Sequence, residues 1–79
     1  MRVHIHYFAL LKEERGLHNE VLTTEAKNLC ELYDELQKRH GFSLDRKQLK
    51  AAVNDQFASW EHSLSENDKV VFVPPVAGG

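Results

Sequence analysis

One amphipathic helix constrains the fold of this chain more than any other feature of its sequence. Asn28 can cap free backbone amides at the helix start, and Glu31, three residues on, can reach back as in a capping box. Gly41 then stands where a left-handed residue ends a helix. These signals predict a helix of about 12 residues that begins at Leu29, near the usual helix length. Its apolar stripe consists of Leu29, Leu32 and Leu36, flanked by Tyr33.

The size and composition of the chain restrict what can surround this helix. At 79 residues there is room for one domain, in which folding removes about 60% of the surface that the unfolded chain exposes. Cys30 is the only cysteine, which rules out an internal disulfide, a four-cysteine zinc site and a cysteine-held iron-sulfur cluster within one chain. The formal net charge is -2, and there is no Lys/Arg block, so the sequence predicts no nucleic-acid binding.

Strand patterns precede the helix. Val3, Ile5 and Tyr7 alternate with His4, His6 and Phe8, which predicts a strand with one buried face that Met1 can extend. The segment 9–15 is rich in helix formers and precedes Gly16, so it predicts one or two helical turns. Residues 18–23 give a weaker strand pattern around Val21 and Leu22.

More strand patterns follow the helix. Residues 42–50 are mostly polar and predict a loop. Residues 51–53 and 57–58 flank the turn formers Asn54 and Asp55, as in a hairpin. After a turn at residues 65–68, the unbroken apolar run 70–73 predicts a central strand that is covered on both faces.

This order of elements predicts an α+β fold of the β-grasp, ubiquitin-like type, in which a mixed sheet curls around one main helix. The domain is expected to span residues 1–73, and residues 74–79 to form a flexible, extended C-terminal tail. A ferredoxin-like βαββαβ fold is the second choice, because residues 42–50 hold too few periodic apolar positions for a second long helix.

The last six residues carry the chemical signal. Pro74 and Pro75 cannot continue a strand ladder and favour an extended arm. Gly78 and Gly79 lack a Cβ atom, so such an arm can enter a narrow channel and present its terminal carboxylate to another protein. A frayed terminus is the alternative, and it would be favoured if the prolines and the preceding strand were missing.

Three segments, YFALLKE at residues 7–13, AAVN at 51–54 and DKVVFVPPVAGG at 68–79, resemble the small subunits of molybdopterin synthase, which are ubiquitin-like sulfur carriers. The resemblance covers essentially the whole chain, and PPVAGG after an apolar strand is its most specific part. Two positions depart from the family pattern. Asn67 stands where relatives usually have glycine, and because asparagine tolerates positive φ the turn is expected to survive. Lys69 stands at a usually acidic position and alters charge complementarity with a partner.

The resemblance implies a function for Gly79. A ubiquitin-activating-type enzyme uses ATP to adenylate its carboxyl group, and a sulfur donor protein converts the adenylate to a thiocarboxylate. The synthase large subunit, in a heterotetramer with the carrier, then uses that sulfur to build the molybdopterin dithiolene on a cyclic pyranopterin precursor. The carrier itself is expected to hold no permanent cofactor and no metal, and catalysis is assigned to the partner subunit.

By their position in these motifs, six residues are expected to bind partners, with Gly78 threading into the partner's channel: Phe8, Lys12, Phe57, Val73, Pro74 and Pro75. Phe8 lies on the His4/His6 side of its strand and is expected to be exposed, whereas simple core packing is an equal alternative for Phe57 and Val73. His4 and His6 share a strand face without a third metal ligand of suitable spacing. Cys30 is expected to be a packed structural residue, and Trp60 to cover the core edge or a partner.

Two other functions stay open from the sequence. The chain can serve as a sulfur carrier in another pathway, such as a thiamine-type pathway, since such arms also end in Gly-Gly. It can also be a ubiquitin-like modifier, whose carboxyl group forms an amide with a target lysine, or a non-catalytic β-grasp interaction module. No secretory signal pattern is present, and no apolar run approaches the roughly 18 residues of a membrane span, so a cytoplasmic protein is expected.

Overall fold

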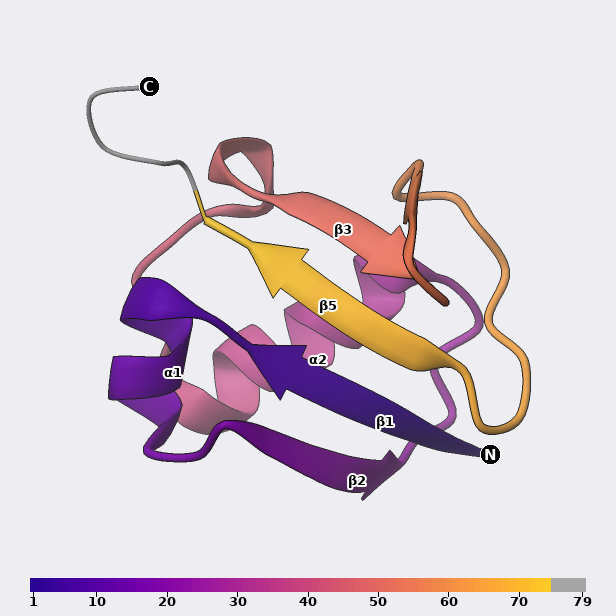
Figure 1. Ribbon diagram of the computed structural model, residues 1–79, viewed down its shortest axis with the longest axis horizontal. Helices are drawn as coiled ribbons and strands as arrows, with labels where there is room; N and C mark the ends of the chain where they lie inside the picture. The colour runs from indigo at the N-terminus through magenta and orange to yellow at the C-terminus, as the bar shows by residue number, and fades with distance from the viewer. Residues whose placement is uncertain (75–79) are drawn as a thin grey trace.

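The structure is a computed structural model that describes residues 1–74 (Figure 1). Its elements follow the chain in this order: β1 (Arg2–Tyr7), α1 (Ala9–Arg15), β2 (Asn19–Thr23), α2 (Leu29–His40), the 3₁₀ helix η1 (Arg46–Gln48), β3 (Lys50–Val53), β4 (Gln56–Ala58) and β5 (Lys69–Val73). The strands form one five-stranded sheet in the order β2-β1-β5-β3-β4. This mixed sheet around one main helix confirms the predicted β-grasp class.

The centre of the sheet joins the two ends of the chain. β1 and β5 pair in parallel, with Ile5 opposite Val70 and Tyr7 opposite Phe72, and every other pair of neighbouring strands is antiparallel. In Figure 1 β1 and β5 run side by side toward the same end of the sheet, where the described chain leaves β5. The last strand is therefore held in the middle of the sheet and not at an edge.

The main helix forms as its sequence predicts. The Asn28 side chain accepts a hydrogen bond from the Glu31 amide at 2.8 Å, and Gly41 has a φ of 69° at the C-cap. The Glu31 side chain reaches back one residue further than a capping box requires, because it accepts from the Lys27 amide at 3.1 Å. The whole predicted stripe of Leu29, Leu32, Tyr33 and Leu36 is buried.

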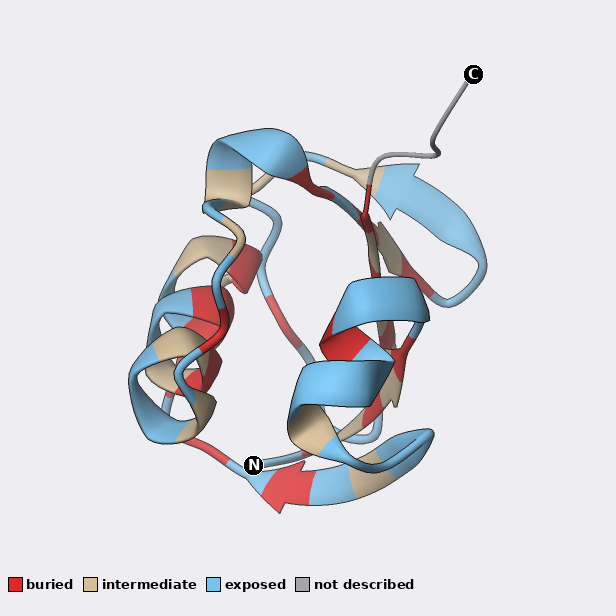
Figure 2. Cartoon of the chain, turned by 90° about the vertical axis from the view of Figure 1, so that its left-hand side faces the viewer, coloured by how far each residue is buried: buried red, intermediate tan, exposed pale blue. Residues whose placement is uncertain are grey.

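A single core fills the space between α2, α1 and one face of the sheet, and the buried positions of these elements face one another in Figure 2. Aromatic side chains hold its centre: the ring of Tyr33 lies 5.2 Å from that of Phe72 and 6.1 Å from that of Phe42. Trp60 stacks on Phe72 at 6.0 Å. Trp60 therefore covers the edge of the core, as one of its two predicted roles required.

Two turns confirm predictions that rested on backbone conformation. Asn54 and Asp55 have φ values of 51° and 73°, the positive values that a tight hairpin turn between β3 and β4 needs at both central residues. Asn67 has a φ of 67°, and its amide donates to the Arg2 carbonyl at 2.7 Å. Asn67 therefore adopts the left-handed conformation that was expected of it as the replacement for a glycine.

Two predictions need correction. The run Val70–Val73 is central, but its two faces are not equally covered: Val70 and Phe72 are buried, whereas Val71 and Val73 are only half-buried on the sheet face that α2 leaves open. Residues 42–50 are also not a plain loop, because they contain η1 and bury Phe42 and Leu49. Phe42 packs there between the rings of Tyr7 and Tyr33, which come from distant segments.

A cluster of polar side chains connects α1 to β1 and β2. Glu20 accepts from the Tyr7 hydroxyl at 2.6 Å and from two Arg15 nitrogens at 2.9 Å. These bonds, with that of Arg15 dominant, lower the pKa of Glu20 from 4.5 to about 2. His40 Nε2 lies 3.8 Å from Glu20, beyond hydrogen-bond distance, and burial together with the nearby Arg15 lowers the pKa of His40.

We predict that Glu20→Gln removes a pH-dependent part of the stability. The depressed pKa of Glu20 stabilises the folded state above pH 4.5, and this contribution is lost as the pH falls from 4.5 to about 2. The wild-type protein should exceed the variant by about 3 kcal/mol in unfolding free energy at pH 7, measured by denaturant titration. The difference should vanish near pH 2.

Glu13→Gln, an exposed control on α1, should change the unfolding free energy by less than about 0.5 kcal/mol. If the unfolding free energies of Glu20→Gln and wild type fell in parallel as the pH is lowered, the pH-dependent stabilisation would not come from the Glu20 carboxylate.

Candidate functional site

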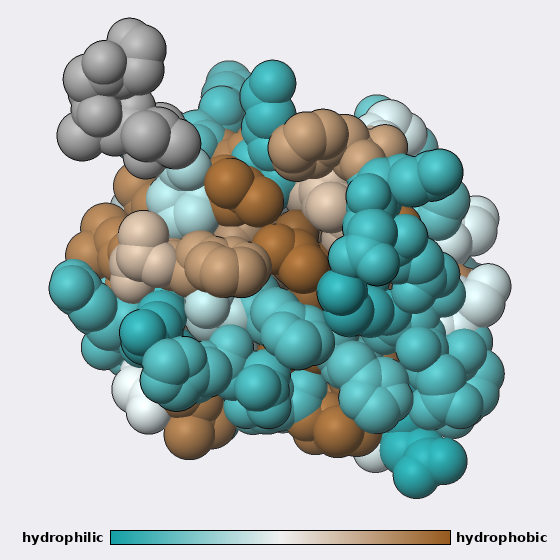
Figure 3. Space-filling view, viewed as in Figure 1, coloured by the Kyte–Doolittle hydropathy of each residue, from teal (hydrophilic) through white to brown (hydrophobic). Residues whose placement is uncertain are grey.

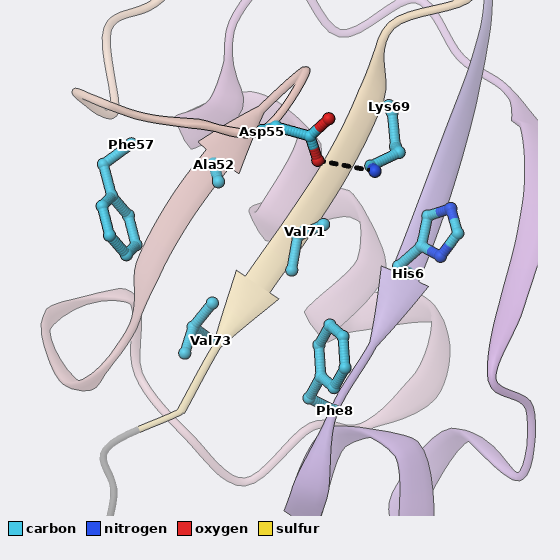
Figure 4. Close-up of a pocket in the computed structure, with 8 residues that line it drawn as sticks. All are labelled: His6, Phe8, Ala52, Asp55, Phe57, Lys69, Val71 and Val73. Carbon is cyan, nitrogen blue, oxygen red and sulfur yellow. Dashed lines mark ion pairs between the residues drawn. The ribbon is translucent and has the colours of Figure 1, made fainter.

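An apolar hollow of about 320 Å³ lies on the open face of the sheet, opposite α2. In Figure 3, apolar side chains gather over the middle of the sheet, with hydrophilic side chains around them. The residues that line the hollow are drawn in Figure 4 and come from β1, the N-cap of α1, β3, the turn between β3 and β4, β4 and β5: His6, Phe8, Ala52, Asp55, Phe57, Lys69, Val71 and Val73.

The strand register builds the floor of this hollow. Val71 of β5 lies opposite His6 of β1 on one side and opposite Ala52 of β3 on the other, and Ala52 in turn lies opposite Phe57 of β4. Side chains of directly opposed residues point to the same face of a sheet. One row of four side chains therefore crosses four strands, and three of the four are apolar.

Two phenylalanines make this face unusually apolar for exposed surface. The Phe57 side chain is 73% exposed and that of Phe8 is 51% exposed. Fully burying such a side chain contributes about 1.5–3 kcal/mol. A contiguous apolar patch with a charged border is typical of a surface that binds another protein. This face therefore has the properties of a docking face, the name we use below for the eight residues around the hollow.

One end of the docking face is charged. Lys69 Nζ lies 2.6 Å from Asp55 Oδ1, and both side chains are well exposed, so the pair itself contributes little to stability. Asn54 holds the backbone of Lys69 in place through two hydrogen bonds. The Asn54 side-chain oxygen accepts from the Lys69 backbone amide at 3.0 Å, and the Asn54 backbone amide donates to the Lys69 carbonyl at 2.8 Å. Lys69 is thus held at the border of the apolar hollow.

The structure brings most of the predicted partner-binding residues together. Phe8, Phe57 and Val73 all line the docking face, so core packing is excluded for Phe57. Pro74 is buried beside Val73 in an adjoining hollow, and Lys12 lines a further one together with Phe8. Pro75, Gly78 and Gly79 lie outside the described residues, so their predicted roles stay predictions.

Sequence reasoning missed Val71 and Ala52, whereas it did single out Lys69 for its charge. Val71 and Val73 are two residues apart and share a face of β5, but the unbroken apolar run of this strand does not indicate that this face is open. Nothing local to Ala52 gave such a signal, since its exposure depends on the small size of its side chain and on its neighbours in the sheet.

The remaining candidates show no separate site of their own within residues 1–74. Within residues 1–74 no group of three His, Cys, Asp or Glu side chains is placed to hold a metal ion. His4 and His6 share the open sheet face, as predicted. Cys30 is half-buried in the first turn of α2, where its sulfur contacts the guanidinium group of Arg46.

The fold and the docking face define a class: a small ubiquitin-like domain whose central strand connects an apolar docking face to the C-terminal residues. The model of the ThiS family matches residues 5–79, and the chain belongs to this family.

Two curated relatives carry the same name. The chain is 30% identical over 82 residues to the molybdopterin synthase sulfur carrier subunit of Mycobacterium tuberculosis, covering 100% of this chain and 99% of that protein. It is 44% identical over 41 residues to the Escherichia coli protein of the same name, and that match spans 52% of this chain and about half, 51%, of the relative.

Solved structures agree on the fold. A putative molybdopterin converting factor subunit 1 from Pyrococcus furiosus superposes with a TM-score of 0.77 at 28% identity, with 95% of this chain and 98% of that chain covered. A chain in a complex of subunits 1 and 2 of the molybdopterin-converting factor from Helicobacter pylori has a TM-score of 0.70 at 26% identity, with both chains fully covered. Haloferax volcanii SAMP1, at 19% identity and a TM-score of 0.82 over 100% of both chains, shares the fold.

Among the described residues, no helix has the length and apolar character that crossing a membrane requires.

We predict that Phe57 can be made polar at little cost to stability. Because the Phe57 side chain is 73% exposed, Phe57→Ser should change the unfolding free energy by less than about 1 kcal/mol. Phe72→Ala, which truncates a fully buried aromatic ring, should cost about 3–5 kcal/mol. Thermal and denaturant unfolding of the two variants give the comparison, and a large loss of stability in Phe57→Ser would show that this ring belongs to the core.

Proposed function

We propose that this protein is the sulfur carrier subunit of a molybdopterin synthase and that it works through the carboxyl group of Gly79. The observation that carries the proposal is the course of β5. This strand contributes Val71 and Val73 to the docking face and leads directly into Pro74, which begins the PPVAGG sequence. A partner that covers the docking face is therefore positioned to receive the residues that follow. The names of the two curated relatives support the same function.

The first step activates the terminal carboxylate, which is a poor electrophile. An oxygen of the Gly79 carboxylate attacks the α-phosphorus of ATP on an adenylating enzyme, which forms the acyl adenylate and releases pyrophosphate. Sulfide-level sulfur from a donor protein then attacks the acyl carbon and displaces AMP. The product is a thiocarboxylate, an anionic sulfur nucleophile, and no base or metal of the carrier is needed.

The second step passes the sulfur on. The thiocarboxylate sulfur attacks a carbon of the pterin precursor on the synthase large subunit and displaces an oxygen substituent from that carbon. Water then cleaves the resulting thioester, which leaves the sulfur on the pterin and returns Gly79 to its carboxylate form. Each dithiolene holds two sulfur atoms, so two charged carriers are consumed for each product. A complex with two copies of each subunit, a heterotetramer, follows as the proposed assembly, and the Helicobacter pylori complex of two subunits supports the pairing.

A second function shares the same activated intermediate. If a lysine amine of a target protein displaced AMP, the carrier would become a ubiquitin-like modifier joined by an amide bond. The archaeal modifier proteins among the structural neighbours are 18–20% identical to this chain and share its fold. A thiamine-type carrier would differ only in the acceptor of the sulfur. The sulfur-bearing product and its acceptor distinguish these alternatives.

We predict that the protein acquires a thiocarboxylate when it is incubated with ATP, its host's adenylating enzyme and a sulfur donor. Its intact mass should rise by the difference between a sulfur and an oxygen atom. Oxidation of a side chain would raise the mass by nearly the same amount, so the product should also be alkylated with iodoacetamide. In a Cys30→Ser variant, which has no thiol left, a single alkylation would report the thiocarboxylate alone. An unchanged mass with a demonstrably active enzyme would refute the carrier function.

We predict that deletion of Gly79 abolishes sulfur transfer without unfolding the domain. The last strand, β5, ends at Val73, ahead of the deleted residue, so the unfolding free energy should stay within about 0.5 kcal/mol of the wild-type value. Gly79→Ala keeps the terminal carboxylate at residue 79 and adds a Cβ atom. This variant tests whether the partner's channel is too narrow for a side chain, whereas the deletion tests whether the carboxylate must be at residue 79. Pterin sulfuration by the truncated protein, measured in a reconstituted synthase, would contradict the proposed role of the tail.

A further inference from the structure

A second hollow, of about 370 Å³, lies beside the docking face where the described chain leaves β5. Phe57 and Val73 line both hollows, and Figure 4 shows both side chains over the open face of the sheet. We call this second hollow the basic groove. Its lining residues come from η1, β3, β4 and the end of β5: Lys47, Gln48, Leu49, Lys50, Phe57, Val73 and Pro74.

The backbone fixes two lysines next to the last described residues. Lys50 lies directly opposite Val73 in the register of β3 and β5, and its Nζ atom lies 5.9 Å from the centre of the Phe57 ring. Lys47 is exposed on η1, which is anchored through the buried Leu49. The groove thus combines an apolar floor with two exposed cations beside Pro74, the last described residue.

The charge around this region is opposite in sign to that of the whole protein. The two hollows are lined by Lys47, Lys50 and Lys69 and by a single carboxylate, Asp55, which already pairs with Lys69. Neither Lys47 nor Lys50 forms an ion pair with any residue of the described part of the chain. The chain as a whole carries a formal charge of -2. A positive region on a net negative protein favours a partner surface that carries carboxylates.

We propose that the basic groove binds an acidic, partly apolar surface of the adenylating enzyme, and that Lys47 and Lys50 determine how fast the carrier engages that enzyme. This inference rests on the proposed carrier function. Charges at the border of an interface change the association rate and its salt dependence more than they lengthen the life of the complex. Such an interface suits a partner that the carrier engages briefly and repeatedly, and activation requires one such encounter for every sulfur atom that is carried.

The test uses the carrier and the adenylating enzyme of its host, with ATP–pyrophosphate exchange as the measurement. Lys47→Glu/Lys50→Glu should raise the carrier concentration for half-maximal exchange by about tenfold near 50 mM salt and should leave the maximal rate within about twofold. The defect should shrink near 300 mM salt, because the Debye length falls well below 10 Å. Lys27→Glu/Lys38→Glu changes the net charge equally at two exposed positions before and within α2, and it should behave as the wild-type protein does.

Each result has one meaning. Absence of exchange with the wild-type carrier would contradict the proposed function itself. Normal exchange by the wild type and by Lys47→Glu/Lys50→Glu at every salt concentration would overturn the inference alone. A loss of binding only to the synthase large subunit, measured by calorimetry, would overturn the assignment to the adenylating enzyme. If the double Glu variant does not fold, Lys47→Gln/Lys50→Gln replaces it, with a smaller rise of the same kind expected and an unchanged value overturning the inference.

Discussion

The parallel pairing of β1 with β5 is the interaction on which the rest of the structure depends. It joins the first and last of the five strands, so the two strands that are farthest apart in the sequence lie side by side at the centre of the sheet. Backbone bonds continue the pairing beyond the strand, since the His4 amide donates to Asp68 and the Asn67 amide donates to Arg2. The pairing sets Val70 and Phe72 against α2 on one face. It also fixes the position of Val73, the last strand residue before Pro74.

The same constraint explains why one small domain can have a buried core and an apolar open face. α2 covers one side of the sheet, and residues 1–74 contain no second long helix to cover the other. Val71 and Val73 therefore remain half-buried, and Phe57 exposes most of its ring. Ordinary surface selection would favour polar residues at these positions. Their apolar character is explained if a partner completes this face, and the basic groove beside it extends the surface toward the tail.

Local signals in the sequence predicted the local features well. The capping residues Asn28 and Gly41 fixed the bounds of α2, and the tolerance of Asn54 and Asn67 for positive φ gave both turns, because each of these effects acts within a few residues. The burial of Phe42 was not predicted, since its partners Tyr7 and Tyr33 are distant in sequence. The open face of β5 was also missed, because an unbroken apolar run does not reveal whether anything covers the second face of its strand.

The sequence by itself determined the fold class, the single main helix and the family resemblance of its last twelve residues, because periodicity, capping and proline chemistry are local properties. Only the tertiary structure decided which apolar residues are free to bind. Phe57 and Phe72 are the same residue type in strands of the same sheet, yet one is exposed and the other fully buried. The difference arises from the side of the sheet to which each side chain points and from what packs against that side, and both are fixed only when distant strands pair in register.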